Sequence, residues 1–483
     1  MSNYWLTRFW FQKALAFIYL IAFLIALNQF TALNGEHGLV PAAHFLEKFS
    51  FWDMPSIFFL HASDPFFRLV AGLGILLAVL ALTGISEAFG MFFSVAVWFL
   101  LWALYSSFVN IGEVFYGFGW EIMTLEAGFL AIFLGSSKTE PPKIIIGFIR
   151  WMLFRTMFGA GLIKIRGDEC WRDLTCLVYH YETQPLPNPL SWHFHHLPVF
   201  INKLGVAFNH FVELVAPWGY FAPPPVSWIA GGLTVLFQTI LIFSGNLSFL
   251  NYLTIVLAIA CFDDRFLSKL IPVKVPPTVP MSGLRKGVLK VLTGAIVLFS
   301  IPPVVNMFSP YQIMNTSFEP FHLVNTYGAF GSVGKTRPEI IIEGTEETVV
   351  AESTEWREYE FKAKPGDLKR TPPIVSPYHY RLDWLLWFAA MSDFRHYPWI
   401  LNLTAKLLKN DPETLSLIKT NPFPGAPPKY IRAILYEYKF TSPGERKQTG
   451  AWWTRKYLRE YLPALSLDNP QFQGLLQKAG WTE

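Results

Sequence analysis

The sequence predicts a polytopic α-helical membrane domain of about nine spans, followed by a soluble α+β domain that contains a small β-sheet. Hydrophobic residues make up 52% of the 483 residues and charged residues only 15%, whereas a soluble domain carries roughly 25% charged residues. Long apolar runs recur up to about residue 307 and then stop, while Glu, Lys, Pro and Tyr become frequent. We therefore assign residues 1–307 to a transmembrane domain and residues 308–483 to a soluble C-terminal domain.

Nine apolar segments are candidates for membrane spans, each of which needs about 20 mostly apolar residues. The first follows Arg8 and Lys13 and has no small-residue cleavage site, so we interpret it as an uncleaved span rather than a removable signal peptide. Several segments are short, which tilted, broken or re-entrant helices would accommodate. The candidates are Ala14–Phe30, Phe66–Leu82, Phe89–Phe108, Trp120–Leu134, Ile144–Ile163, Val206–Phe221, Val226–Phe243, Leu247–Cys261 and Val288–Val304.

The basic residues of the loops predict the orientation, because cytosolic loops carry an excess of Lys and Arg. With the N-terminus in the cytosol and nine spans, the loops after the fourth and eighth spans return to that side. The outer side then receives the first loop, the loop from Arg166 to Lys203 and the whole C-terminal domain. The basic residues of the two cytosolic loops are Lys138, Lys143, Arg150, Arg265, Lys269, Lys274, Arg285, Lys286 and Lys290.

The C-terminal domain shows short alternations of strand and helix patterns. Glu339–Val350 and Trp356–Lys364 are rich in β-branched and aromatic residues, which is typical of strands. Asp383–Ala390, Leu401–Leu408 and Trp452–Tyr461 are predicted to be short helices. The mixture indicates a compact α+β fold around a small sheet.

The loop after the fifth span holds the most distinctive residues of the chain. Cys170 and Cys176 lie on the predicted outer side, where an oxidising compartment permits a disulfide. Two interpretations remain open: a redox-active pair, or a structural staple or pair of buried thiols. The spacing favours the structural interpretation, because it differs from the Cys-x-x-Cys arrangement that tunes thiol pKa values.

The same loop carries four histidines in the company of Glu182. Imidazole and carboxylate groups bind metals, but the spacing here matches no zinc motif. We therefore expect no metal site and interpret the histidines as part of an interfacial loop. They are His180, His193, His195 and His196.

Charged residues inside the predicted spans mark a second candidate site, because intramembrane charge usually faces a bundle interior or a cavity. At about 1.5 Å per residue, Glu126, Lys164 and Glu213 fall in the outer half of the bilayer. Opposite charges at similar depth can pair. One hypothesis is a single polar cavity, open to the outer side and lined by these residues. The alternative is a set of structural ion pairs between helices. The other intramembrane charged or ionisable residues are Glu121, Arg155 and His210.

Three sequons, beginning at Asn246, Asn315 and Asn402, fall on the predicted outer side. Asn246 lies in a loop too short for a glycosyltransferase to reach. Asn315 and Asn402 are therefore the two candidate glycosylation sites.

The chain is similar to the lipase maturation factor family. The motif Cys-Trp-Arg-Asp-Leu-Thr-Cys at 170–176, followed by His-Tyr-Glu-Thr-Gln-Pro-Leu-Pro-Asn-Pro at 180–189, resembles the family's signature. The resemblance implies a multi-pass protein of the endoplasmic reticulum membrane that assists the folding and assembly of secreted lipases. It also implies that the luminal C-terminal domain contacts the client. Further similar segments are Phe330–Arg337, Trp356–Lys362, Ser376–Trp384 and Asn421–Phe423.

A more distant resemblance concerns Gly159–Lys164, followed by Trp171, which looks like the lysine-bearing segment of vitamin K-dependent gamma-glutamyl carboxylase. In that enzyme the lysine acts as a base on the quinol, so the resemblance implies that Lys164 corresponds to this base. Phe115–Gly117 resembles a second carboxylase segment, but a histidine found upstream in the carboxylase is replaced here by Asn110–Glu113. This departure favours a shared membrane fold with different chemistry.

Three functions follow as hypotheses. The first is a folding factor without enzymatic activity or cofactor, whose clients are secreted lipase-like proteins. The second is a membrane enzyme in which Lys164, with Glu126 or Glu213, acts on a lipophilic substrate such as a quinone or lipid. The third, a transporter, ranks last because the sequence has no repeated halves.

The segment around the cysteines is expected to matter for either of the first two functions, since it joins the fifth span to the outer loop. Trp171, His180 and Glu182 are the residues predicted to contact a client or the rest of the loop. The net charge of +4, without a basic block, gives no case for nucleic acid. The expected location is the endoplasmic reticulum membrane, or the plasma membrane if the host is bacterial.

Overall fold

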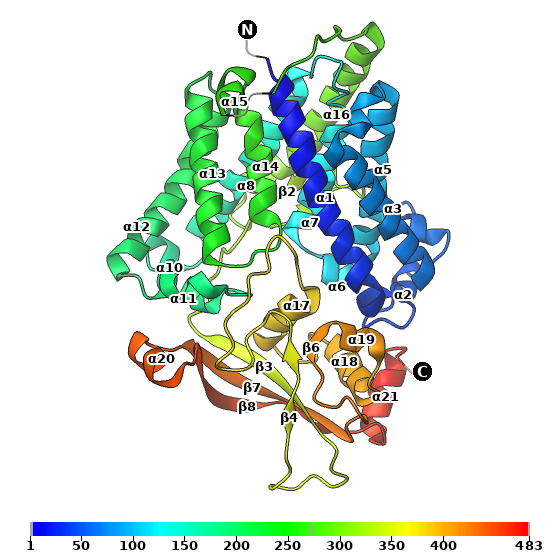
Figure 1. Cartoon of the computed structure of the whole chain (residues 1–483), viewed down its shortest axis with the longest axis vertical. Helices are drawn as coiled ribbons and strands as arrows, with labels where there is room; N and C mark the ends of the chain where they lie inside the picture. Colours follow the sequence, from blue (N-terminus) through cyan, green and yellow to red (C-terminus); the bar gives the residue numbers. More distant parts are fainter. Residues whose placement is uncertain (1–2, 271–272, 482–483) are drawn as a thin grey trace.

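A helical bundle occupies one end of the molecule and a domain built around a β-sheet occupies the other (Figure 1). The computed structural model describes residues 3–270 and 273–481. Within these ranges, seven helices are long and apolar enough to cross a membrane. They are α1 (Trp5–Asn34), α3 (Asp64–Thr83), α5 (Met91–Ile111), α8 (Lys143–Arg166), the segment Val199–Phe221, α13 (Val226–Ser244) and α16 (Gly283–Phe308). The predicted polytopic domain and small sheet are confirmed.

The predicted number of about nine spans is not confirmed, because two of the nine segments form helices that are shorter than a membrane span. Trp120–Leu134 forms α7 (Gly119–Ile132), and Leu247–Cys261 forms α14 (Leu250–Ala258) with the 3₁₀ turn η4 (Ile259–Cys261). With 14 residues, α7 is about 21 Å long, less than the roughly 30 Å hydrocarbon core. All of its residues except Phe129 are buried. Composition alone does not distinguish an apolar helix buried in protein from one that contacts lipid.

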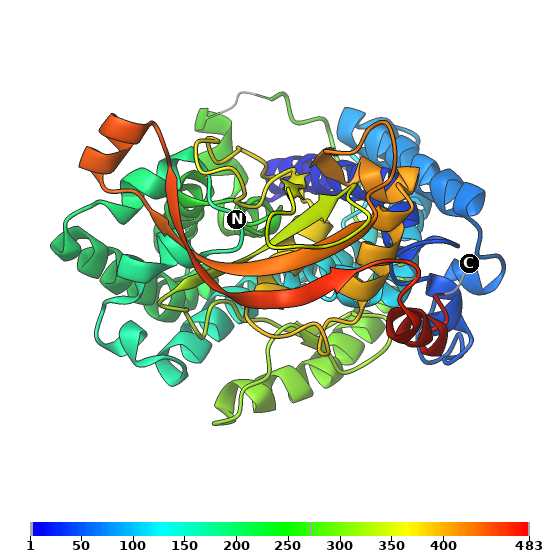
Figure 2. The same cartoon turned by 90° about the horizontal axis from the view of Figure 1, so that it is seen from below.

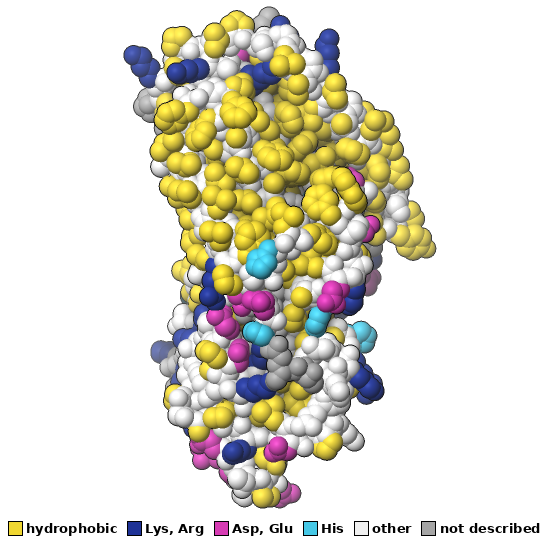
Figure 3. Space-filling view, turned by 90° about the vertical axis from the view of Figure 1, so that its right-hand side faces the viewer, with side chains coloured by type: hydrophobic (Ala, Val, Ile, Leu, Met, Phe, Trp, Pro, Cys, Tyr) yellow, Lys and Arg dark blue, Asp and Glu magenta, His cyan; other side chains and the backbone are white. Residues whose placement is uncertain are grey.

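The basic segments meet at the end of the bundle that lies away from the C-terminal domain. There Arg8 Nη1 donates to the carbonyl of Thr139 at 2.6 Å, and the carboxylate of Asp264 accepts from the backbone N–H groups of Trp5 and Leu6. Figure 3 shows Lys and Arg side chains at this end, a wide hydrophobic band below it and mixed charges on the other domain. This distribution is the one that the positive-inside rule describes.

The C-terminal domain contains a four-stranded antiparallel sheet of order β4-β3-β7-β8. Its strands are β3 (Arg337–Thr345), β4 (Arg357–Glu358), β7 (Tyr430–Phe440) and β8 (Trp453–Leu465). The predicted helices Asp383–Ala390 and Leu401–Leu408 correspond to α17 (Arg381–Ala390) and α18 (Trp399–Leu408). The predicted strand Trp356–Lys364 is divided between β4 and β5 (Glu360–Phe361), which pairs with β6 (Ile418–Thr420) in a separate sheet.

The predicted helix Trp452–Tyr461 is a strand instead. It forms most of β8, which pairs with β7 from Phe440 opposite Trp453 onward. The spacing of its aromatic residues suits a helix face, but Trp, Tyr and Thr also favour strands. The segment forms a strand rather than a helix because it pairs with β7. Local residue spacing does not encode this contact.

The remaining elements are short. Those of the outer loop are α9 (Glu169–Arg172), α10 (Cys176–Thr183) and α11 (Pro189–His195). Val199–Phe221 consists of α12 (Val199–His210), a π-helical turn η2 (Phe211–Val215) and a 3₁₀ segment η3 (Ala216–Phe221). The others are α2 (Ala42–Leu46), η1 (Ile57–Phe59), α4 (Ile85–Ala88), α6 (Glu113–Tyr116), α15 (Asp264–Leu270), β1 (Thr316–Ser317), β2 (Asn325–Thr326), α19 (Pro412–Ser416), α20 (Pro443–Thr449) and α21 (Pro470–Lys478).

One hydrophobic core runs through both parts of the molecule. Trp384 of α17 packs edge-on against Trp120 of α7, with ring centroids 5.2 Å apart, and Trp399 of α18 lies 5.6 Å from Phe115 of α6. Seen from below, the sheet lies across the end of the bundle that meets the C-terminal domain, and α16 lies at the margin of the bundle (Figure 2). The C-terminal domain is therefore packed onto the bundle rather than tethered to it.

Candidate functional site

A cavity of about 1110 Å³ lies where the bundle meets the C-terminal domain. Helices α7, α8, α13 and α14 form its inner wall, the segment 310–338 crosses it, and α17 covers it from the other domain. Its apolar walls include Met157, Ala160, Leu241, Leu250 and Phe388.

Lys164 and Glu213 form a buried ion pair on the cavity wall. Lys164 Nζ lies 2.5 Å from Glu213 Oε1 and 3.2 Å from Asn209 Oδ1, and Asn209 Nδ2 donates to Glu213 Oε2 at 2.9 Å. Glu213 belongs to the π-helical turn η2, an irregularity often found at functional sites. Gly161 permits this approach, since a Cβ there would lie 2.6 Å from the side chain of Leu214. The two opposite charges are thus paired with each other inside the protein.

The expected single cavity shared by Glu126, Lys164 and Glu213 is corrected by the structure. Glu126 forms a separate buried ion pair with Arg155 and also accepts hydrogen bonds from Tyr327 and from the backbone of Asn325. Glu126 does not line the cavity, although Tyr327 does. The sequence located the charges at similar depth, but depth alone did not show which helix faces they occupy.

Two buried arginines of the C-terminal domain bind the elements around the cavity without lining it, and the charge pattern of the sequence did not single out either one. Arg381 Nη1 lies 2.7 Å from Glu121 Oε1 inside the bundle. Arg337 donates to the carbonyls of Glu182, Gln184 and Pro185 in the outer loop. Both arginines lie in segments that resemble the family, which was the only sequence signal for them.

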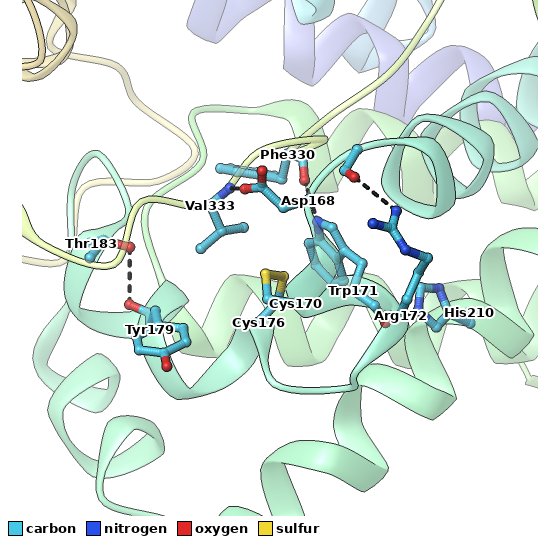
Figure 4. Close-up of a disulfide and its surroundings, with 11 residues drawn as sticks. Asp168, Cys170, Trp171, Arg172, Cys176, Tyr179, Thr183, His210, Phe330 and Val333 are labelled. Carbon is cyan, nitrogen blue, oxygen red and sulfur yellow. Dashed lines mark hydrogen bonds between the residues drawn. A yellow bond between two sulfur atoms is a disulfide. The ribbon is translucent and has the colours of Figure 1, made fainter. Parts of the chain in front are cut away.

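The outer loop is fixed against the segment 330–333 (Figure 4). Cys170 and Cys176 are joined in a disulfide, and both are buried. Trp171 is only 2% exposed; its indole N–H donates to the Phe330 carbonyl at 2.8 Å, and Lys164 Nζ lies 5.2 Å from its ring centroid. Asp168 accepts from the backbone N–H of Val333 at 2.6 Å. Trp171 therefore contacts the outer loop and the segment around Phe330, which is one of its two predicted roles, while contact with a client stays a prediction.

His180 and Glu182 also make contacts within the protein. His180 is buried on the cavity wall, edge-on to the ring of Phe330. Burial, and to a lesser extent the charge of Lys164, lowers the pKa of His180 to about 4. The imidazole is therefore neutral at neutral pH. Glu182 Oε1 accepts from the backbone N–H of Phe440 at 2.6 Å, which ties the outer loop to β7.

The other histidines of the loop point to different partners. His196 Nδ1 lies 2.8 Å from the carbonyl of Trp192, and the ring of His195 packs against Phe440. Among residues 3–270 and 273–481, no three His, Cys, Asp or Glu side chains are grouped to hold a metal ion.

The two candidate glycosylation sites differ sharply in accessibility. Asn315 is exposed. Asn402 is only 4% exposed, and its Nδ2 donates to the carbonyls of Gly38 and Leu39. Because a glycan would attach to that nitrogen, the prediction of Asn402 as an acceptor is wrong. The sequon lies on the amphipathic helix α18 and faces the core.

Comparison with known proteins connects both parts of this architecture with one family. A family model described as the lipase maturation factor transmembrane domain matches residues 6–269, and one described as the lipase maturation factor C-terminal domain matches residues 323–463. No solved structure gives a significant match.

Named relatives match the chain over nearly its full length. Lipase maturation factor 1 of Homo sapiens is 43% identical, with 99% of this chain and 91% of the relative aligned. The Mus musculus protein of the same name is 44% identical, with 97% and 88% aligned. Lipase maturation factor 2 of Mus musculus is 29% identical, with 97% and 84% aligned. The chain therefore belongs to the lipase maturation factor family.

Proposed function

We propose that this protein is a membrane-bound maturation factor that assists the folding, assembly and export of secreted lipases. The observation that carries the proposal is the match of both parts of the chain, at 43% identity and nearly full length, to proteins named lipase maturation factor 1. No cofactor is required for this function. The clients are secreted lipase-like proteins.

The geometry supports a scaffold that holds its outer domain in a fixed position. A buried ion pair and aromatic contacts join α17 to the bundle, and Arg337 of β3 holds the outer loop, so a client bound to the C-terminal domain would be held at the membrane surface. The gathering of basic residues at the opposite end supports a luminal C-terminal domain. We assign the endoplasmic reticulum membrane as its location on the same grounds together with the family membership.

The proposal is tested by lipase maturation in cells that lack their own factor. The full chain and a secreted dimeric lipase are expressed together, and lipase activity per mass of secreted lipase is measured. We expect the activity to rise well above that of cells without the chain. An unchanged ratio of activity to mass, with the chain present at normal abundance, would refute the proposal.

A second candidate function is catalysis by Lys164, favoured by its position on the wall of a large apolar cavity. To act as a base, Lys164 would first transfer a proton to Glu213, whose Oε1 lies 2.5 Å away. The variant Lys164→Met, tested beside Lys164→Arg, separates the two functions. If both variants are abundant and mature lipase normally, Lys164 is structural. If Lys164→Arg is folded and abundant but no longer raises the activity of the secreted lipase, catalysis by Lys164 is favoured.

A further inference from the structure

Part of the cavity lining is exposed directly after the C-terminal end of α16. Tyr311 and Met314 line the cavity and are 88% and 40% exposed. They follow the end of α16 at Phe308, and only 22% of the apolar window of α16 is buried within the protein. A helix so little covered by protein contacts lipid along most of its length. The exposed part of the cavity lining is therefore close in sequence to a helix that faces lipid, and its walls are largely apolar.

The charges on the cavity wall cancel. Its cations are Lys164 and Arg166, and its anions are Asp168 and Glu213. The Arg166 guanidinium donates hydrogen bonds to Gln312 Oε1 at 2.7 Å and to the Met307 carbonyl at 2.8 Å. With His180 neutral, the wall offers no net charge to a ligand. This balance disfavours a head group that carries an uncompensated phosphate or ammonium, since a buried unpaired charge is costly.

Hydrogen-bond donors on the cavity wall nevertheless remain underused. Lys164 Nζ has three N–H donors, of which Asn209 and Glu213 take two. Gln238 is only 5% exposed, and its Nε2 finds the thioether of Met157, a weak acceptor, at 3.5 Å. The buried indole N–H of Trp384 has no partner in the described part of the chain. All three residues line the cavity, so the wall is built for a ligand that supplies acceptor oxygens.

We propose that the cavity binds one neutral acyl-ester lipid of the diacylglycerol type, taken from the membrane. Its ester oxygens accept from Lys164, Gln238 and Trp384, and its chains lie along the apolar walls of α8 and α13. The volume exceeds the roughly 300–1,000 Å³ of usual small-ligand pockets, as long acyl chains require. Lipid binding is measured without a client, so its failure would leave the proposed maturation function standing.

The test uses the full chain in phosphatidylcholine nanodiscs with a diacylglycerol probe that carries a diazirine in its acyl chain. After irradiation, the labelled peptides are identified by mass spectrometry. We expect labels on the segment 310–338 and on α17, both of which line the cavity. Unlabelled diacylglycerol should displace the probe. Phosphatidic acid, the phosphate ester of diacylglycerol, carries negative charge and should displace the probe far less.

Two positions on the same helix provide a matched pair of variants. Ala160→Phe fills the cavity, and we expect it to reduce labelling at least tenfold. Gly147→Phe projects into a separate apolar groove of about 570 Å³ between α8 and α16, where a Cβ meets nothing within 4 Å, and should leave cavity labelling unchanged. Gln238→Leu removes this donor at similar volume, together with the Oε1 atom that accepts from Asn251 Nδ2 at 2.7 Å, and should weaken labelling about threefold to tenfold.

Three results would overturn the proposal. Labels confined to the lipid-facing helices would mean that the cavity holds water. Equal displacement by phosphatidic acid would mean that an uncharged head is not selected. Equal labelling of the wild type and folded Gln238→Leu would remove the hydrogen-bonding role, and this variant decides the matter even if Ala160→Phe fails to fold.

Discussion

Arg381, at the start of α17 in the C-terminal domain, forms an ion pair at 2.7 Å with Glu121 of α7, and neither side chain is exposed to solvent. The same guanidinium donates to the Phe115 carbonyl at 2.6 Å and lies 3.5 Å from the ring centroid of Tyr116. A residue of the C-terminal domain is thus part of the interior of the bundle. Four measurable expectations follow from this arrangement and from the site beside it.

Removing the cation of this pair should be far more harmful than removing both charges. We expect Arg381→Met to reduce the free energy of unfolding by roughly 3–5 kcal/mol, because it leaves a buried carboxylate unpaired. Adding Glu121→Gln should restore more than half of that loss. Unfolding of the purified protein in detergent, followed in a double-mutant cycle, measures both values.

The exposed pair Arg68–Glu413, which also joins the bundle to the C-terminal domain, is the matched control. Its side chains are 48% and 45% exposed, so Arg68→Met should cost less than about 1 kcal/mol. Equal losses from Arg381→Met and Arg68→Met would contradict the buried character of the first pair.

The disulfide should act as a staple rather than as a redox centre. Cys170→Ser with Cys176→Ser should lower the free energy of unfolding by about 2 kcal/mol, the loop-closure value for so short a loop. Because the sulfur atoms are buried, lipase maturation per folded molecule should stay at the wild-type level. Loss of maturation at normal abundance would indicate a redox role instead.

Glycosylation tests which sequons are accessible and on which side of the membrane the C-terminal domain lies. In a eukaryotic host, Asn315→Gln should remove one endoglycosidase-sensitive shift in gel mobility, since Asn315 is exposed and lies on the side of the C-terminal domain. Asn402→Gln should remove none, because the Asn402 amide is buried.

A new sequon made by Pro280→Asn, before Met281 and Ser282, lies at the opposite end of the bundle. It should remain unmodified. Modification at residue 280 but not at Asn315 would reverse the orientation.

Stability should fall on mild acidification, with His180 as one cause. Burial and the charge of Lys164 hold the folded pKa of His180 at about 4, below the unfolded value of about 6.5. The unfolded chain therefore binds the proton first, and stability is lost as pH falls from about 6.5 toward 4. We expect His180→Gln to lessen the loss between pH 7 and pH 5 by about 2 kcal/mol.

His193 on the same loop serves as the control, because it is exposed. His193→Gln should leave the pH dependence of unfolding unchanged. A wild-type unfolding free energy that does not vary between pH 7 and pH 5 would contradict the assigned state of His180.

Features encoded locally were predicted well from the sequence. The apolar runs predicted the membrane helices. The distribution of Lys and Arg among the loops predicted that the basic residues gather at one end of the bundle. Helices α17 and α18 follow from amphipathic spacing. The strand β8 was mistaken for a helix, because its identity depends on pairing with β7, which lies elsewhere in the sequence.

The candidate site was predicted in part. The sequence did not reveal which residues of the C-terminal domain bind the bundle and the outer loop. Lys164 and Glu213 were identified as intramembrane charges of opposite sign, and they do meet. The partner of Glu121 comes from beyond the membrane domain, and the outer loop is held by Arg337 of β3. Side chains that meet only after two domains pack together leave no periodic signal in either one.

The origin of Arg381 outside the bundle bears on the order of biosynthesis. Glu121 leaves the ribosome long before the residue that neutralises its charge, and α7 is too short to settle as an ordinary span. The bundle therefore stays electrostatically incomplete until the C-terminal domain has been translated and folded onto it. A chain that ends before residue 381 would keep the Glu121 carboxylate without its cationic partner.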